Sequence, residues 1–268
     1  MGRLQDKRLF LLDMDGTIYL DDRLFDGVTA FLSRIREKGG RYLFLTNNSS
    51  KGVEGYIEKL NGMGIATGRE DYLTSVDAAI DLLRRRYPGR RCYVQGTRSF
   101  YDQLAAAGIP VTCDREDGAE ILLSGFDREL TFQKLEDACI LLNRGVPFVA
   151  TNPDWVCPMP AGEVLPDCGS ICALLTAASG VKPTYIGKPN RNMVDVISAQ
   201  TGVPNEQICC VGDRLYTDIA VAVNAGAQSV LVMSGETDEA MLRASDVQPK
   251  YVLRDVAELA QILRDGTV

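Results

Sequence analysis

Histidine is absent from this chain of 268 residues. Its absence excludes Ser-His-Asp and Cys-His catalysis, together with the usual zinc sites built on imidazole ligands. Carboxylates, lysines and hydroxyl groups must therefore carry out whatever chemistry the protein performs.

The chain also has no long apolar run, no excess of basic residues and no paired cysteines. No apolar run approaches the roughly 20 residues that cross a bilayer, and the polar segment 1–8 does not resemble a cleavable signal, so we expect a cytoplasmic protein without a membrane partner. The formal net charge of −7 argues against a nucleic-acid partner, because proteins that bind nucleic acid normally carry a basic face. The eight cysteines lack CxxC spacing, and we expect buried, reduced thiols.

Short apolar runs alternate with segments of helical period, which is typical of βαβ units around a parallel sheet. The clearest buried strands are expected at 9–12, 42–45, 208–211 and 229–233. Between the first two, apolar residues from Val28 to Ile35 recur at helical spacing, and this predicts a crossover helix that packs on the sheet. The fold class is therefore α/β, with a Rossmann-like parallel sheet.

Two segments rich in turn residues indicate domain boundaries, at Pro88-Gly89 and at 181–183. Between them lies a separate set of expected strands and helices, at 92–94, 101–107, 121–124, 132–143, 147–150 and 169–179. We therefore expect one domain made of 1–88 and 183–268, and an inserted α/β domain at 89–182.

Polar side chains follow several of the expected strands. Asp13 and Asp15 come directly after the first strand, Thr46 follows the second, and Asp213 and Asp218 follow the strand at 208–211. Ligands of open α/β sheets bind in the crevice at the carboxyl ends of the strands. A short strand at 185–186 also precedes Gly187-Lys188-Pro189, so a lysine is expected at the same crevice.

Several carboxylates at one point repel each other unless cations balance them. The cluster therefore implies a metal ion with a lysine nearby. Oxygen ligands, without histidine or a cysteine cluster, favour Mg²⁺, which binds through one or two carboxylates and a substrate phosphate. This points to phosphoryl chemistry on a small phosphate ester.

These residues resemble the motifs of the haloacid dehalogenase superfamily. Asp13 to Thr17 (DMDGT), the strand end at Thr46, the Lys188 loop and residues 212–218 (GDRLYTD) match its four motifs in order. A block of roughly 90 residues between the second and third motifs resembles the subfamily with an α/β cap, which includes NagD-like, pyridoxal-phosphate and 4-nitrophenyl phosphatases. The segments TNNS at 46–49, ATNPD at 150–154 and GKP at 187–189 are further NagD-like features.

The resemblance assigns a role to each motif residue. It implies that Asp13 is the nucleophile that becomes an aspartyl phosphate, and that Asp15 is the general acid and base. The metal ligands would be the carboxylates of Asp13 and Asp213 and the backbone carbonyl of Asp15. Asp218 would orient Lys188 or a metal-bound water.

Further residues are expected to contact the phosphate or to shape the site. Thr46, Asn47 and Lys188 would hold the phosphoryl oxygens, with Asn48 beside them. Backbone groups from Arg214 to Thr217 would contact the phosphate or the substrate, and Gly212 would serve a tight turn. Each residue taken alone has another interpretation: Thr46 and Asn48 as helix caps, Asp218 as an N-cap and Lys188 as a solvated side chain.

A loop of the inserted domain, at 152–160, is expected to select the leaving group and exclude water in the resembled subfamily. Asp154, Trp155 and Met159 are the candidates for contact with substrate, although a lone tryptophan is more often a core residue. The loop lacks the histidines associated with pyridoxal-phosphate specialists, so sugar phosphates, phosphoglycolate, nucleotides and aryl phosphates all stay open. Homodimers formed through the cap are common in the subfamily.

Two other classes of function compete with a phosphatase. A phosphomutase or a dehalogenase would keep the fold, but Asp15 argues against dehalogenation, which needs no protonated leaving group, and the large cap argues against a typical mutase. A receiver-type signalling module also uses a strand-end aspartate, a threonine and a lysine around Mg²⁺. The inserted domain and Asp15 favour turnover over a long-lived phosphoryl mark.

Overall fold

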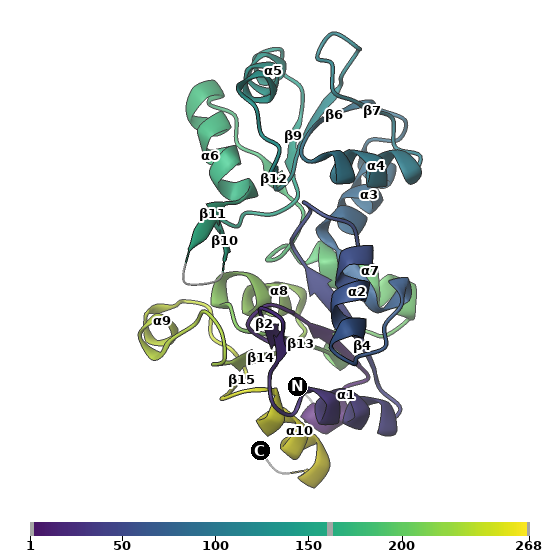
Figure 1. The fold of residues 1–268 in the computed structure, drawn as a ribbon, viewed down its shortest axis with the longest axis vertical. Coiled ribbons are helices and arrows are strands. Elements are labelled where there is room, and N and C mark those ends of the chain that lie inside the picture. Colours follow the sequence, from purple (N-terminus) through teal and green to yellow (C-terminus); the bar gives the residue numbers. More distant parts are fainter. Residues whose placement is uncertain (1–2, 160–162, 267–268) are drawn as a thin grey trace. The chain divides into compact units, whose positions relative to one another are not determined.

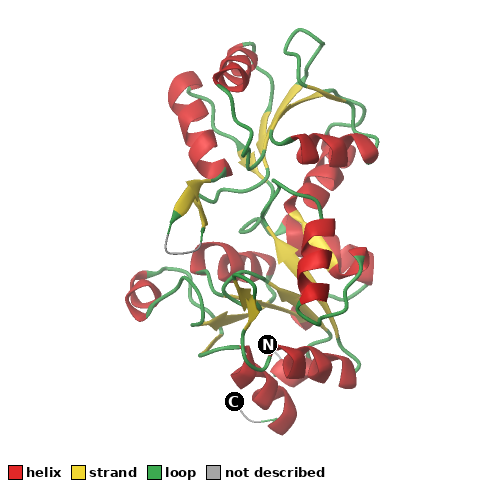
Figure 2. Cartoon of the chain, viewed as in Figure 1, coloured by secondary structure: helices red, strands yellow, loops and turns green. Residues whose placement is uncertain are grey.

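The computed structural model describes residues 3–159 and 163–266, and contacts along the chain divide it into two units (Figure 1). The core unit comprises Met1–Thr46, Glu54–Leu73 and Lys188–Val268. The cap unit comprises Asn47–Val53 and Thr74–Gly187. Each unit has its own sheet, and both sheets are flanked by helices (Figure 2).

The sheet of the core unit has the strand order β15-β14-β13-β1-β4-β5. Strand β1 lies near its centre and pairs in parallel with β13 and β4, and the parallel pairing continues through β14 to β15. All four residues of β1 are buried, as expected for a strand covered on both faces. The strands are β1 (Leu9–Leu12), β4 (Arg41–Thr46), β5 (Tyr72–Thr74), β13 (Ile208–Gly212), β14 (Gln228–Val232) and β15 (Tyr251–Leu253), with a separate hairpin of β2 (Tyr19–Leu20) and β3 (Arg23–Leu24).

The core helices bury apolar stripes against this sheet. Helix α1 buries Val28, Phe31, Leu32 and Ile35, and it packs beside α10, as Figure 1 shows. The helices are α1 (Val28–Glu37), α2 (Glu54–Gly62), α7 (Asn192–Thr201), α8 (Ala220–Ala225), α9 (Glu239–Ala244) and α10 (Val256–Asp265), with short turns η1 (Leu4–Asp6), η2 (Arg69–Asp71), η4 (Asn205–Gln207) and the π-helical turn η5 (Leu215–Ile219).

The cap unit has a second parallel sheet, in the order β12-β9-β8-β6-β7, and an antiparallel hairpin of β10 and β11. Threonine hydroxyls cap three of its helices: Thr74 accepts a hydrogen bond at the start of α3, Thr97 at the start of α4 and Thr131 at the start of α5. The elements are α3 (Ser75–Arg86), β6 (Cys92–Gln95), α4 (Arg98–Ala106), β7 (Val111–Thr112), β8 (Ile121–Ser124), α5 (Phe132–Asn143), β9 (Phe148–Ala150), β10 (Val156–Pro158), β11 (Val164–Pro166), α6 (Cys168–Ser179) and β12 (Thr184–Tyr185).

The two units divide the chain differently from the expected domains. The boundary expected at Pro88-Gly89 lies inside the cap unit, because α3 packs against α4. The boundary expected at 183 also lies inside it, because β12 pairs with β9 of the cap sheet and the core resumes only at Lys188. Among the described residues, the structure contains no helix that is both long and apolar enough to span a membrane.

Candidate active site

The carboxyl edge of the core sheet gathers the first group of site residues. In the sheet register, Leu12 of β1 lies opposite Phe44 of β4 and Val211 of β13. The residues that follow each strand therefore reach the same edge, and the Asp13 amide donates a hydrogen bond of 2.9 Å to the Val211 carbonyl. Strand register therefore places the residues of the first, second and fourth motifs that follow these strands at one edge of the sheet.

Lys188 supplies the cation at this edge. Its Nζ lies 2.6 Å from Oδ1 of Asp13 and 2.6 Å from Oδ1 of Asp218, and it donates a third hydrogen bond of 3.2 Å to the Leu45 carbonyl. Burial opposes the charge of the ammonium, but the carboxylates of Asp13 and Asp218 outweigh that effect and raise the Lys188 pKa. Lys188 is therefore a buried, charged and fully hydrogen-bonded lysine.

Three carboxylates converge beside this lysine. Oxygen atoms of Asp13, Asp213 and Asp218 all lie within 4.8 Å of one another. Burial and the neighbouring Asp218 raise the pKa of Asp13 well above its usual range, and the same two causes raise the Asp213 pKa to about 7. Without a further cation, this site favours protonated carboxylates over a cluster of negative charges.

The residues fit a hard divalent cation. Oδ2 of Asp213 accepts a hydrogen bond of 2.7 Å from the Glu236 amide, but the buried Oδ1 has no hydrogen-bond partner among the described residues. A buried carboxylate oxygen without a hydrogen-bond partner is costly, and binding of a cation at this oxygen would offset that cost. The donor set, which is made only of oxygen atoms, matches the preference of Mg²⁺.

Three glycines allow the aspartates to pack this closely. A Cβ atom at Gly16 would lie 2.5 Å from Oδ2 of Asp213, and one at Gly235 would collide with the same oxygen. Gly212 was expected to serve a tight turn, and this expectation is wrong. Gly212 is the last residue of strand β13, and a Cβ there would collide with the side chain of Asp218.

Asp15 lies apart from the three clustered carboxylates. Its side chain is exposed, and Oδ2 accepts a hydrogen bond of 3.4 Å from the hydroxyl of the buried Tyr19. The turn that carries it is closed by Gly16, whose φ of 84° lies in the left-handed region that favours glycine. The carboxylate of Asp15, two residues from Asp13, is therefore accessible to a small molecule from solvent.

The residues expected to hold phosphate fall into both units. Thr46 ends β4 in the core unit, where it is buried, whereas Asn47 and Asn48 belong to the cap unit. Asn48 Oδ1 accepts hydrogen bonds of 2.8 Å from both the amide and the hydroxyl of Ser50. This is a local turn contact and not a helix cap, because the following helix α2 begins only at Glu54. The Arg214 amide, expected to contact the phosphate, donates instead to Asp218 at 3.1 Å.

The candidate substrate residues of the cap differ sharply in exposure. Trp155 is 61% exposed, so it is not a core residue of the unit, whereas Asp154 is only 4% exposed. Asp154 Oδ2 accepts hydrogen bonds of 2.9 Å from the side-chain amides of Asn47 and Asn152. Met159 is partly buried, and the end of the expected loop at Pro160 lies outside the described residues.

One segment of the site was missed by the sequence reasoning. The residues after β14 close over Asp213: besides the Glu236 amide, the Ser234 hydroxyl donates to the Gly16 carbonyl at 2.7 Å, and the Thr237 hydroxyl donates to the Asp213 carbonyl at 2.5 Å. The available signal was Ser234-Gly235, a small polar turn after a strand already recognised as buried.

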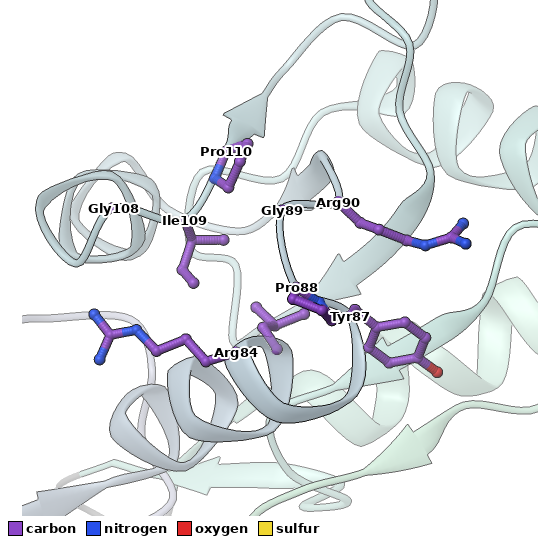
Figure 3. A pocket seen from close by; sticks show the side chains of 9 residues that line it. Arg84, Tyr87, Pro88, Gly89, Arg90, Gly108, Ile109 and Pro110 are labelled. Carbon is purple, nitrogen blue, oxygen red and sulfur yellow. The ribbon is translucent and has the colours of Figure 1, made fainter.

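A hollow in the cap unit contains none of the predicted site residues (Figure 3). It is lined by the end of α3 and by the loops before β6 and β7, so it lies at the amino ends of the cap strands. Its two arginines already have partners, because Arg84 donates to the Ala107 carbonyl and Arg90 pairs with Glu120. The hollow therefore does not compete with the aspartate site.

The parallel sheet and the lysine-bridged aspartates at its carboxyl edge form an α/β protein with a site suited to phosphoryl chemistry, and comparison with known proteins identifies its family. A family model described as haloacid dehalogenase-like (HAD-like) hydrolase matches residues 10–110, and a second HAD-hydrolase-like family model matches residues 185–259. The acid sugar phosphatase of Staphylococcus aureus is 30% identical over 95% of this chain and 97% of its own length.

Solved structures agree with this result. The 4-nitrophenylphosphatase of Thermotoga maritima superposes with a TM-score of 0.92 at 41% identity, covering 97% of this chain and 98% of its own. NagD of E. coli K-12 gives 0.85 at 28% identity, with 94% and 98% covered. The chain belongs to the haloacid dehalogenase superfamily, in the NagD-like subfamily IIA, and it is a phosphatase of that superfamily.

Proposed function

We propose that this protein is a Mg²⁺-dependent phosphomonoester hydrolase that acts on small phosphorylated metabolites through an aspartyl phosphate at Asp13. The observation that carries the proposal is the buried bridge of Lys188 between Asp13 and Asp218, with Asp213 completing a group of three carboxylates. Such a pairing of one lysine with several carboxylates suits a site that must also accept the charges of a phosphate and a divalent cation.

The metal would be held by the carboxylates of Asp13 and Asp213 and by the backbone carbonyl of Asp15. The unpartnered Oδ1 of Asp213 supports this assignment, since it leaves one buried oxygen free for a ligand. When bound, Mg²⁺ would neutralise part of the negative charge of the carboxylates and of the phosphate. Asp218 would then act mainly through Lys188, to which it is already hydrogen-bonded.

Asp13 is proposed as the nucleophile. Its Oδ1 is held by Lys188, and its side chain is 17% exposed, in contrast to the nearly inaccessible Asp218. In the first step an oxygen of Asp13 attacks phosphorus and the bond to the leaving alkoxide breaks; in the second, water attacks phosphorus and releases Asp13. Lys188 and Thr46 would stabilise the charge on the phosphoryl oxygens in both transition states.

Asp15 is proposed as the general acid and base. Its exposed carboxyl group would give a proton to the leaving alkoxide and later take one from the attacking water. The hydrogen bond from Tyr19 would fix its orientation. A dehalogenase would need no such acid, and no observation on this chain favours that reaction over phosphate transfer.

The relatives support a small phosphate ester as substrate. Their names describe an acid sugar phosphatase, a 4-nitrophenylphosphatase and, for Mycobacterium tuberculosis, a glycerol phosphate phosphatase in complex with magnesium, whose structure gives a TM-score of 0.87 at 28% identity and covers 96% of this chain and 78% of its own. The formal net charge of −7 argues against nucleic acid as a partner. A homodimer formed through the cap rests on the family resemblance, and sedimentation analysis tests it.

The test is phosphate release from a panel of phosphomonoesters, with Mg²⁺ and with a chelator. We expect release only with Mg²⁺, loss of release in Asp13→Asn, and full activity in the control Asp26→Asn, which changes an exposed aspartate of the same unit. Phosphate release by Asp13→Asn at the rate of the control would refute the mechanism. Halide release, or a phosphoryl group that persists on the protein, would instead favour a dehalogenase or a receiver-type module.

A further inference from the structure

Two proposed phosphate-binding residues each adjoin a point where the chain passes between the units. Thr46 is the last core residue before Asn47, and Lys188 is the first core residue after Gly187. Both Asn47 and Gly187 belong to the cap unit. The positions of Thr46 and Lys188 are therefore each constrained, through one peptide bond, by a residue that the cap unit holds.

Asn47 and Gly187 are packed against each other inside the cap unit. A Cβ atom at Gly187 would lie 2.5 Å from Oδ1 of Asn47 and 2.5 Å from the Thr151 carbonyl. The Gly187 amide donates to that same carbonyl at 2.7 Å, and the Asn47 carbonyl accepts a hydrogen bond of 2.6 Å from the Ser75 hydroxyl. These contacts hold Asn47 and Gly187 together at the two crossings, which are the points where the chain passes from Thr46 to Asn47 and from Gly187 to Lys188.

Asp154 holds the side chain of Asn47 at this place. Its Oδ2 accepts hydrogen bonds of 2.9 Å from Asn47 Nδ2 and from Asn152 Nδ2. The loop that carries Asp154 is itself anchored on the first turn of α6, because the Gly169 amide donates to the Asp154 carbonyl at 2.8 Å and Asn152 also donates to Asp167. The carboxylate is therefore a fixed support and not a mobile side chain.

The charge of Asp154 argues against direct contact with the phosphoryl group, because a carboxylate repels a phosphate. Its burial, with 4% exposed, also argues against contact with a leaving group from solvent. A buried carboxylate that accepts two amide hydrogen bonds is expensive to desolvate, and such groups are kept where they fix a conformation.

We infer that Asp154 is a positioning residue. It orients the side-chain amide of Asn47 and thereby fixes the backbone at Asn47 and Gly187, to which Thr46 and Lys188 are joined. This inference rests on the proposed function, in which Asn47, Thr46 and Lys188 bind the phosphoryl group. It assigns Asp154 to phosphate binding through Asn47, whereas the sequence suggested a contact with substrate.

Inorganic phosphate is the probe that separates these two roles, because it has no leaving group. For Asp154→Ala we expect the inhibition constant of phosphate to rise roughly 10- to 100-fold, with an equal fall in kcat/KM for both an aryl and an alkyl phosphate. Asp154→Asn should restore values close to those of the wild type, because its amide oxygen can accept both hydrogen bonds in place of Oδ2. An unchanged phosphate constant in Asp154→Ala, or a fall confined to one leaving group, would overturn the inference.

Asp137→Ala is the matched control. Asp137 is another buried carboxylate of the cap unit, and it accepts hydrogen bonds from Tyr93, Arg115 and Gln133 and not from Asn47. It should lose thermal stability without a change in the phosphate constant. An equal rise of the phosphate constant in Asp137→Ala would show that general loosening of the cap, and not Asp154, explains the effect.

A double-mutant cycle tests the route through Asn47. In an Asn47→Ala background, Asp154→Ala should weaken phosphate binding by less than 2-fold further, since the side chain that it orients is already gone; additive losses would refute the route. Phosphate binding measured by calorimetry does not depend on turnover. If the wild-type protein binds phosphate with Mg²⁺ but hydrolyses no ester, the proposed function is refuted, whereas the effect of Asp154 on phosphate binding can still be measured.

Discussion

Replacement of Lys188 by methionine removes the ammonium group that lies 2.6 Å from Oδ1 of Asp13. Its Nζ has three acceptors, at 2.6 Å from Asp13, 2.6 Å from Asp218 and 3.2 Å from the Leu45 carbonyl, and only 4% of the side chain is exposed. Breaking a buried ion pair by removing one partner typically costs about 3–5 kcal/mol, because the other charge stays buried and unpaired. For a domain of this size we expect the melting temperature to fall by roughly 6–20 °C.

Activity should fall further than stability explains. Below its melting temperature, Lys188→Met should be folded but should lose turnover, because it lacks the cation that we propose stabilises the phosphoryl oxygens. Differential scanning calorimetry gives the melting temperature, and phosphate release measured below that temperature gives the turnover rate of the same preparation.

Lys134→Met provides the matched control in the cap unit. Lys134 Nζ likewise has three acceptors, in this case one carboxylate and two carbonyls: Asp127 at 2.9 Å, the Gly96 carbonyl at 2.8 Å and the Glu129 carbonyl at 3.1 Å. It should lose stability and keep its turnover rate. If Lys188→Met melts like the wild type, or turns over as fast as Lys134→Met, the reasoning about the buried bridge is wrong.

Three further predictions follow from the site. Burial and Asp218 raise the Asp213 pKa to about 7, so the stability of the metal-free protein should fall by up to about 4 kcal/mol as the pH rises from 4 to 7, because over this range the folded state keeps a proton that the unfolded state has already lost. Stabilisation by Mg²⁺ should grow over the same range, and melting curves with and without chelator measure both trends. Gly212→Ala should cost about 1–3 kcal/mol and most of the activity, because its Cβ would displace Asp218, whereas Gly62→Ala, with open space around it in α2, should be stable and active in the same melting and turnover assays. Asp15→Asn should slow alkyl phosphate hydrolysis by about 10²- to 10⁴-fold and 4-nitrophenyl phosphate hydrolysis much less, since a good leaving group needs little protonation; equal slowing of both esters would contradict its role as an acid.

Local patterns predicted the elements of this fold better than its division into units. The helix expected at 132–143 is observed as α5 with the same bounds, and the strand expected at 121–124 is observed as β8. Helix α3 lies within the segment 1–88 that was expected to form part of the core, but apolar periodicity tells which face of a helix is buried and not which sheet covers that face. For that reason α3 and β12 were assigned to the core when they pack in the cap unit.

The site shows the same distinction. Strand order made the convergence of Asp13, Asp213 and Asp218 predictable, because each follows a parallel strand, and their oxygens do lie within 4.8 Å of one another. Two features were not predictable: the need for glycine at position 212 beside Asp218, and the hydrogen bond from the Glu236 amide to Asp213. Both depend on how closely two segments approach in space. The bond between Asn47 and Asp154 joins residues 107 positions apart, and no local pattern encodes it.

The most direct test of the central claim is to trap the phosphoryl group during turnover. The protein is mixed with a phosphomonoester and Mg²⁺, quenched in acid within the first turnover, and digested for peptide mass analysis. We predict that the peptide containing Asp13 carries one phosphoryl group, that this group disappears when the substrate is exhausted, and that Asp13→Asn shows none. A phosphoryl group on another residue, or turnover with no phosphorylated peptide in a quench fast enough to precede hydrolysis, would contradict the account.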